Sequence, residues 1–432
     1  MRIYSAQPKL LFRGNCDSCR DYCVDLVPKF VMADGLLVKI LLKMNAQVCF
    51  FVWLAHWPRL AKPDIIHSRL ALLQDYIDFR LVDGSYVYKK GSDSMFWGKA
   101  QLLHKVPATE SEALSTGLVS MWGKRGLRNF LVYIKDFDAA NQSTWKSFDP
   151  KTQTAAELFA KFSLDDDTVD FVGHAMALQD SDTYLTQPAI KLIDAVKLYA
   201  TSLAAHSKSP YLYPVYGLSG LPEAFSRVCS VRGGIFMLHH DVDEILFADG
   251  KVAGVRVGEQ AATAPVVISD PSYAPKSRVE SSGRIVRTIA LLNHPVEQVK
   301  TVKSAQIIIP QKQIGRAHDV YMTVLSDQHN VVAKDKFVAI CSTVAESSAP
   351  KEEVAAGVAL LGDMVCRFDN VSETFTAKDD GSADNLFVTS SLDATSHFES
   401  VAKEVLSIWK RITGSDFDLA PAVQGAAAAG GQ

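Results

Sequence analysis

The chain has 432 residues, 48% of them hydrophobic, which is enough to bury the cores of about two or three domains. Its formal net charge of −3 at pH 7 provides no basic surface, which excludes nucleic acid as a partner. Residues 1–14 lack the apolar core of a secretory signal peptide, and the seven cysteines are irregularly spaced, so a reducing cytosol is expected.

A helical region is predicted between residues 107 and 207. Apolar residues recur there at three- and four-residue spacing, and runs of β-branched residues are few. The expected helices lie at 112–122, 127–137, 155–162, 167–178 and 189–204. Because proline suits the first position of a helix, Pro188 marks the start of the last one. This periodicity predicts an all-helical domain inserted into the rest of the chain.

The stretch 209–273 predicts one helix followed by short strands. Gly220 permits a turn, Pro222 suits the first position of the helix, and the glycine pair at 233–234 ends it. Apolar and β-branched residues then predict strands at 235–238, 244–247, 252–257 and 266–268. The Asp-Gly pair at 249–250 predicts a hairpin turn between two of these strands.

The chain after residue 273 returns to strands. Alternating, β-branched segments lie at 285–292, 304–309, 319–326 and 336–342, whereas 351–364 and 396–413 have helical periodicity. Together with the preceding stretch, they predict that residues 208–418 form the second part of a large α/β domain. The Ala/Gly-rich tail at 419–432 has nothing to bury, so we expect it to be disordered.

Catalytic and metal-binding motifs are missing from the sequence. It contains no GxxxxGK[ST] phosphate loop, no HExxH and no GxSxG. His239 and His240 are adjacent, so on a strand they point to opposite faces and cannot bind one metal ion together. Cys16 and Cys19 form a CxxC without a second ligand pair. We therefore expect no enzyme activity, no metal and no cofactor.

Several short fragments match one protein family in the same order. They are VDLVPKF at 24–30, KVPATE at 105–110, SPYLYP at 209–214, DPSY at 270–273, SAQIIIPQKQ at 304–313 and DATSHFE at 393–399. The chain from Arg20 to about Gly414 thus resembles the Rab GDP dissociation inhibitor and Rab escort protein family. That resemblance implies an α/β large domain of the flavoprotein-like, FAD/NAD(P)-binding type, whose first part is residues 1–106, with the helical domain inserted.

The sequence departs from the family pattern in three places. Family members open with a βαβ unit that carries a GxGxxG-like turn, and this chain contains no GxGxxG. We therefore expect the first βαβ unit to be missing. Residues 45–74 and 92–103 interrupt the family pattern, and we interpret them as inserts that arise from translated intron. A membrane-anchoring hairpin is the alternative for the apolar stretch at 48–55.

The resemblance implies a monomeric regulator rather than an enzyme. It would bind GDP-bound, prenylated Rab GTPases, slow GDP release, extract the Rab from membranes and keep it in the cytosol. A geranylgeranyl chain favours apolar surroundings by on the order of 10 kcal/mol, so an apolar protein pocket is needed to compete with the bilayer. One alternative is a Rab escort protein, although those are usually longer. The other is a flavin-dependent oxidoreductase, which the missing GxGxxG turn disfavours.

The resemblance also assigns candidate binding residues. The Rab-binding platform maps to Arg227, Met237, Ile235, Gly220 and Arg20. Gly220 stands where the family has an acidic residue, and Ile235 replaces a usual threonine. The region that holds the extended Rab C-terminal tail maps to Tyr86 and Tyr88, where backbone pairing or a groove would suit an extended peptide.

Two further regions complete the expected site. The prenyl pocket maps to apolar residues of the helical domain: Met121, Phe130, Leu131, Ile134, Phe171, Ala175 and Leu178. A mobile loop that engages a membrane-side receptor maps to Lys208 and Ser209. Both assignments rest on the family resemblance.

Overall fold

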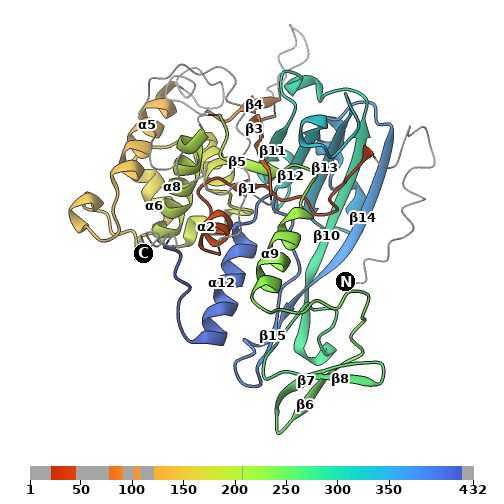
Figure 1. The fold of residues 1–432 in the computed structure, drawn as a ribbon. Helices are drawn as coiled ribbons and strands as arrows, with labels where there is room; N and C mark the ends of the chain where they lie inside the picture. The colour runs from red at the N-terminus through yellow and green to blue at the C-terminus, as the bar shows by residue number, and fades with distance from the viewer. Residues whose placement is uncertain (1–20, 45–76, 91–101, 108–120, 207, 421–432) are drawn as a thin grey trace, which may run out of the picture.

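The computed structural model describes residues 21–44, 77–90, 102–107, 121–206 and 208–420. Helices of the middle of the chain gather on one side of the molecule, and a large sheet forms the other side (Figure 1). Helices α2 (Leu36–Lys43), α12 (Glu399–Thr413) and α9 (Gly220–Val231) lie between them and below. None of the described helices has the length and apolar character needed to cross a bilayer.

The large sheet has seven strands in the order β14-β10-β13-β12-β11-β3-β4. Their bounds are Cys366–Ala377, Val279–Leu292, Phe337–Val344, Val320–Ser326, Ala305–Ile309, Gly84–Tyr88 and Leu103–Lys105. Neighbouring strands are antiparallel except for β11 and β3, which are parallel. Every residue of the central strand β12 is buried, so both faces of the sheet are covered there.

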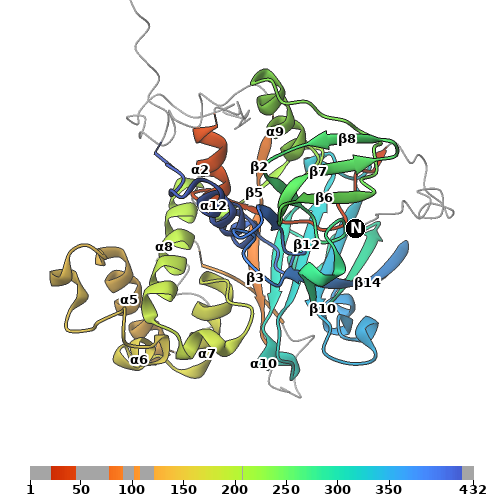
Figure 2. The same cartoon turned by 90° about the horizontal axis from the view of Figure 1, so that it is seen from below.

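Three smaller sheets complete the strands. The first is antiparallel, with β1 (Val31–Met32), β5 (Tyr211–Pro214) and β2 (Phe79–Leu81), and the second pairs β9 (Val267–Ser269) with β15 (Leu386–Val388). The third is the meander of β6 (Glu244–Ala248), β7 (Lys251–Val257) and β8 (Gln260–Thr263), which lies away from the helical side (Figure 2). Asp249 and Gly250 both have positive φ, so the predicted hairpin turn is confirmed.

The helical segment contains α5 (Met121–Asp136), α6 (Ala155–Lys161), α7 (Asp166–Asp170), the π-helical turn η3 (Phe171–Met176) and α8 (Ala189–His206). Helix α6 begins with a capping box: the Thr154 amide donates to Glu157 Oε2 (2.7 Å), and the Glu157 amide donates to Thr154 Oγ1 (3.2 Å). The remaining short helices are α10 (Gln311–Ile314), α11 (Ala355–Ala359), η2 (Gln142–Trp145), η4 (Asp182–Thr186), η5 (Lys276–Arg278), η6 (Glu297–Val299), η7 (Asp327–His329) and η8 (Pro350–Glu352).

Some predicted elements differ from the structure. The predicted helix at 351–364 is reduced to η8 and the single turn of α11, and β8 and β14 were not predicted. The predicted insert at 92–103 ends too late, because Leu103 is a buried residue of β4 that pairs with Tyr88. The predicted insert at 45–74, the tail from residue 421 and most of the predicted helix at 112–122 lie outside the described residues.

The helices and the sheet share one hydrophobic core. Phe130, Leu158 and Ile193 of the helical segment belong to the same buried cluster as Leu291 and Ile340 of the sheet. Because this cluster is continuous, the helical insert is held in place by apolar packing rather than by its chain connections alone.

Candidate functional site

An exposed apolar surface follows α9. The helix ends at Val231, Gly233 adopts φ +89°, and the chain then runs without helix or strand to β6. The apolar residues here have exposed fractions of 50% to 88%, and we name them the apolar patch: Val231, Ile235, Phe236, Met237 and Leu238. Contiguous exposed apolar surface of this kind is typical of a protein interaction site.

The predicted strand at 235–238 is wrong. Its apolar residues have high β-propensity, but that propensity reflects packing on a half-buried sheet surface. Within the described part of the chain, no strand pairs with this segment. Ile235 and Met237, which the sequence assigned to the platform, are exposed, and sequence reasoning missed that Val231, Phe236 and Leu238 are exposed as well.

Buried contacts of α9 hold the apolar patch in place. Leu221 and Ala224 face inward and join the core cluster that contains β1, β5 and α2. The turn before the helix is fixed by Asp25, whose carboxylate accepts the Leu218 amide at 2.9 Å and the Tyr213 hydroxyl. Burial raises the pKa of Asp25, although these two hydrogen bonds oppose the rise. The VDLVPKF fragment thus positions the start of α9.

The other platform residues lie on the same helix. Arg227 is exposed on α9, and Gly220 is its half-buried first residue. A Cβ atom built on Gly220 would lie 3.8 Å from the nearest methyl group of Ile77, which is an ordinary van der Waals distance. Gly220 therefore has room for a Cβ atom, as the acidic residue predicted from the family resemblance would require. Arg20 lies outside the described residues.

The predicted mobile loop falls on residues with different surroundings. Lys208 is exposed, whereas Ser209 is completely buried, and its hydroxyl accepts the Tyr211 amide at 3.3 Å. Of this pair, Lys208 is the one that can meet a partner without a change in the structure.

The strand order bears on one of the two expected modes of tail binding at Tyr86 and Tyr88, backbone pairing, and leaves contact in a groove as a prediction. Tyr86 is buried and Tyr88 half-buried, and both pack in the core cluster of the large sheet. Strand β3 already pairs with β11 on one side and β4 on the other. A peptide cannot therefore add its backbone to β3, and among these strands an added peptide would have to pair with β4.

The predicted prenyl residues meet in one apolar cluster. Phe130, Ile134, Phe171 and Ala175 are buried in the shared core, and Leu131 and Leu178 are half-buried against it. The side chain of Met121, at the start of α5, is not among those described. Phe130 contacts the rings of Phe159 and Phe162, both at centroid distances of 5.7 Å.

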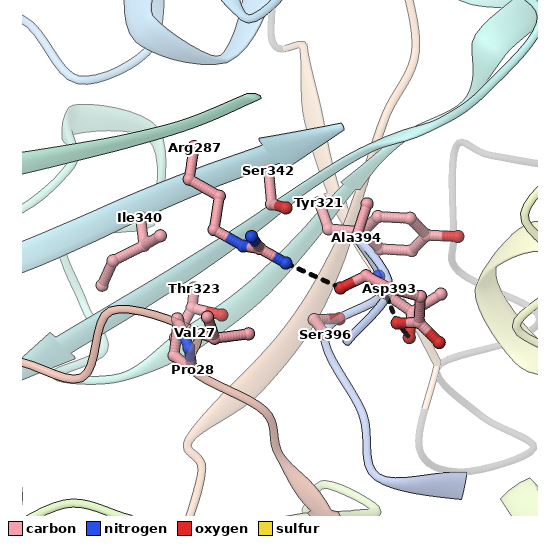
Figure 3. Close-up of a pocket in the computed structure, with 11 residues that line it drawn as sticks. Val27, Pro28, Arg287, Tyr321, Thr323, Ile340, Ser342, Asp393, Ala394 and Ser396 are labelled. Carbon is pink, nitrogen blue, oxygen red and sulfur yellow. Dashed lines mark hydrogen bonds between the residues drawn. The ribbon is translucent and has the colours of Figure 1, made fainter. Parts of the chain in front are cut away.

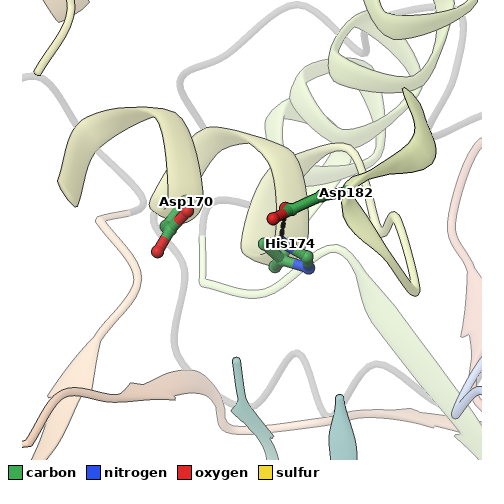
Figure 4. A group of neighbouring side chains, drawn as sticks. All are labelled: Asp170, His174 and Asp182. Carbon is green, nitrogen blue, oxygen red and sulfur yellow. Dashed lines mark hydrogen bonds and ion pairs between the residues drawn. The ribbon is translucent and has the colours of Figure 1, made fainter. Parts of the chain in front are cut away.

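A charged network that the sequence did not predict joins the helical segment to the large sheet. Its members in the helical segment are Asp170, His174 and Asp182 (Figure 4). His174 lies in η3, and its Nδ1 is 2.8 Å from Asp319 Oδ2, just before β12. Its Nε2 is 3.3 Å from Asp182 Oδ1. The Lys312 Nζ of α10 is 2.6 Å from Asp170 Oδ1 and 3.2 Å from Asp182 Oδ2.

The same network resembles a metal site in its donor atoms. The donor atoms of Asp170, His174 and Asp182 lie within 4.8 Å of one another. However, the Lys312 ammonium already contacts both aspartates. Burial lowers the pKa of His174, but the hydrogen bonds and charges of Asp319 and Asp182 outweigh it and raise the pKa to about 9. A raised histidine pKa weakens metal binding, because a metal ion must displace the proton, so these contacts favour an ion-pair network.

Comparisons with known proteins agree with this structure. A family model described as "GDP dissociation inhibitor" matches residues 11–54 and 65–423, so it begins before Arg20, and its gap lies inside the predicted insert at 45–74. Two mammalian proteins described as Rab GDP dissociation inhibitor beta are each 39% identical to this chain. The Canis lupus familiaris protein matches over 96% of this chain and 84% of its own length, and the Rattus norvegicus protein over 92% and 81%.

A solved structure supports the same assignment. The crystal structure of a Rab GDI from Plasmodium falciparum superposes with a TM-score of 0.81 and 37% sequence identity, covering 93% of this chain and 85% of that one. The predicted fold class, an α/β large domain with an inserted helical domain, is therefore confirmed. On the combined match of family model, relatives and fold, the chain belongs to the GDP dissociation inhibitor family.

Proposed function

We propose that this protein is a Rab GDP dissociation inhibitor, which binds GDP-bound Rab GTPases and slows the release of GDP. The observation that carries the proposal is the apolar patch beside α9, in a chain that is 39% identical to proteins described as Rab GDP dissociation inhibitor beta. Interface centres are rich in apolar anchors and Arg, so the patch and the exposed Arg227 supply suitable chemistry for a protein partner.

The proposed action needs no catalysis. Family members regulate GTPases, and a regulator need only bind the GDP state more tightly than the GTP state. The difference in affinity then shifts Rab toward the bound, GDP-loaded form. We propose a monomer of the cytosol that contacts membranes transiently while it exchanges Rab.

We further propose that the helical segment takes up the prenyl group of the Rab. The buried apolar cluster around Phe130 and Phe171 could rearrange around a lipid, with the half-buried Leu131 and Leu178 at its rim. Moving a geranylgeranyl chain from a bilayer requires an apolar site that compensates on the order of 10 kcal/mol. Protein contact at the apolar patch and lipid contact at the helices, linked by the Rab tail, would then reinforce each other.

A membrane-extraction assay tests the proposal. Membranes loaded with prenylated Rab, in either the GDP or the GTP state, are mixed with this chain, and soluble Rab is measured. We expect extraction of the GDP form only. Equal extraction of both nucleotide states, or of neither by a folded chain, would contradict the proposal.

Matched variants locate the binding surface. The double variant Ile235→Ser/Met237→Ser should weaken extraction about tenfold or more, because central interface anchors each contribute over 1 kcal/mol. Val405→Ser is the control, since Val405 is also an exposed apolar residue but lies on α12. If both variants lose the same amount of extraction, the apolar patch is not the specific contact.

A further inference from the structure

A polar cleft, none of whose lining residues belongs to the apolar patch, lies between the large sheet and the segment 393–396 (Figure 3). It has a small chamber of about 10 Å³ and a larger one of about 170 Å³. The two chambers share the lining residues Tyr321, Asp393, Ala394 and Thr395. By volume, the small chamber admits about one water-sized group, and the larger one about ten.

Three neighbouring strands present polar side chains to this cleft. Arg287 of β10 lies directly opposite Ser342 of β13, which in turn lies directly opposite Tyr321 of β12. Because paired residues of adjacent strands project from the same face of a sheet, these side chains form a row across three strands. All three residues line the small chamber.

The buried charges beside the cleft do not balance. Lys29, whose side chain is 1% exposed, places Nζ 2.5 Å from Asp393 Oδ1. Arg287 is 5% exposed and donates only to backbone carbonyls, those of Leu392 (3.3 Å) and Asp393 (2.9 Å). Among the described residues, Arg287 forms no ion pair. Two buried cations therefore face a single carboxylate, and buried charge of this kind is normally paired.

The row also contains unused hydrogen-bond donors. Within the described part of the chain, neither the Tyr321 hydroxyl nor the Ser342 hydroxyl has a hydrogen-bond partner, although both oxygens are buried. Burial raises the pKa of Tyr321, so its hydroxyl stays protonated and can donate. Buried polar groups without partners are uncommon, and each calls for an explanation.

From this geometry we propose that the cleft binds a small oxyanion, a carboxylate or a monoanionic phosphate group. One oxygen would enter the small chamber and accept hydrogen bonds from Arg287, Ser342 and Tyr321. The body of the ligand would occupy the larger chamber, which reaches the surface at the exposed Ser282 and Arg284. Asp180 and Asp319 also line that chamber, so a ligand with several negative charges is disfavoured.

Thermal unfolding of the full chain in different salts tests this proposal. Sodium acetate and sodium phosphate are compared with sodium chloride at equal ionic strength, and the dependence of the unfolding temperature on anion concentration gives an apparent Kd. We expect a saturable rise for at least one of the two oxyanions. A rise for acetate alone identifies a carboxylate site, and a rise for phosphate alone identifies a phosphate site. No rise beyond that in chloride would overturn the proposal.

Two variants separate ligand binding from a structural role. Tyr321→Phe removes a hydroxyl that has no partner among the described residues, so it should leave the unfolding temperature in chloride unchanged or higher but weaken oxyanion binding about tenfold. Arg287→Met should abolish the saturable rise, and if that variant fails to fold, Tyr321→Phe carries the test. Lys300→Gln, which removes an exposed surface cation, should behave like the parent chain. An equal rise in the parent chain and Tyr321→Phe would show that the salt acts nonspecifically and would refute the site.

Discussion

His174 Nδ1 lies 2.8 Å from Asp319 Oδ2, and this contact joins the inserted helices to the large sheet through a fully buried pair of side chains. Asp182 contacts the other ring nitrogen at 3.3 Å, and Lys312 connects Asp182 to Asp170. These residues come from η3, α7, η4, α10 and the position just before β12. The network therefore links the helical segment to the start of β12 in the large sheet.

The histidine predicts that stability falls as the pH rises above neutral. Its pKa is about 9 in the folded chain, above the ordinary 6.5, so the folded state binds more protons than the unfolded state. The stabilisation is complete below about pH 6.5 and is lost as the pH rises through about 9, with an upper limit of roughly 3 kcal/mol. Urea unfolding at pH 6, 7.5 and 9 measures this decrease.

The control for that prediction is a pair of histidine variants. His174→Gln should remove this part of the pH dependence, whereas His318→Gln, at a partly exposed histidine, should retain it. A parent chain whose unfolding free energy is the same at pH 6 and pH 9 would show that His174 is not protonated in the folded state.

The ion pair between the buried Lys29 and the partly exposed Asp393 predicts a clear stability loss when it is broken. Although burial raises the pKa of Asp393, the Lys29 charge and several hydrogen bonds outweigh it and lower the pKa to about 2. Lys29→Met would remove the closest cation from Asp393, whose side chain is 39% exposed, so the free energy of unfolding should fall by about 1.5–3 kcal/mol, as for a lost hydrogen bond to a charged group. Chemical denaturation measures this change in the free energy of unfolding. Lys43→Met, which breaks the exposed pair with Asp418, should cost at most about 1 kcal/mol. Equal losses in the free energy of unfolding for Lys29→Met and Lys43→Met would contradict this prediction.

Gly220 predicts a gain of function. Replacing it with Glu would restore the acidic residue of the family at a position with room for a side chain. Rab affinity should increase roughly fivefold, as expected for one added charge pair. Inhibition of GDP release from Rab measures the effect. Gly220→Gln is the matched control, because it adds nearly the same volume without the charge. If Gln improves affinity as much as Glu, the gain does not come from a charge pair.

Leu131 tests the proposed lipid site. Leu131→Asp would place a carboxylate at the rim of the apolar cluster, so binding of prenylated Rab should weaken at least about tenfold. Binding of unprenylated Rab should not change. The adjacent Val132, which is exposed on the same helix, provides the control Val132→Asp. The affinities of prenylated and unprenylated Rab for each variant are measured in parallel. An equal loss of affinity for the two forms would show that Leu131 does not belong to the lipid site.

Local sequence was sufficient for elements whose signals lie within a few residues. The Asp249-Gly250 turn formed as predicted because both residues tolerate positive φ, and α6 begins at a capping box written into Thr154 and Glu157. Helical periodicity also indicated which residues of the helical segment face inward, and Phe130 and Ile134 of α5 are buried in the shared core. The family fragments also assigned Arg227 and Met237 to a binding platform, which stays a prediction, and the structure places both residues at the surface.

Tertiary structure decided everything that depends on a distant partner. Residues 235–238 have strand propensity but lack a strand to pair with, so they became exposed surface. The polar β14, by contrast, forms because β10 pairs with it from Val279 to Leu291. Lys312 and Asp170 are 142 residues apart in the sequence, and Lys29 and Asp393 are 364 residues apart, so no local sequence pattern predicts these ion pairs. Whether a residue is buried or paired with an opposite charge depends on which residues surround it in the folded chain. The sequence by itself determined only which apolar and charged residues were available for burial and pairing.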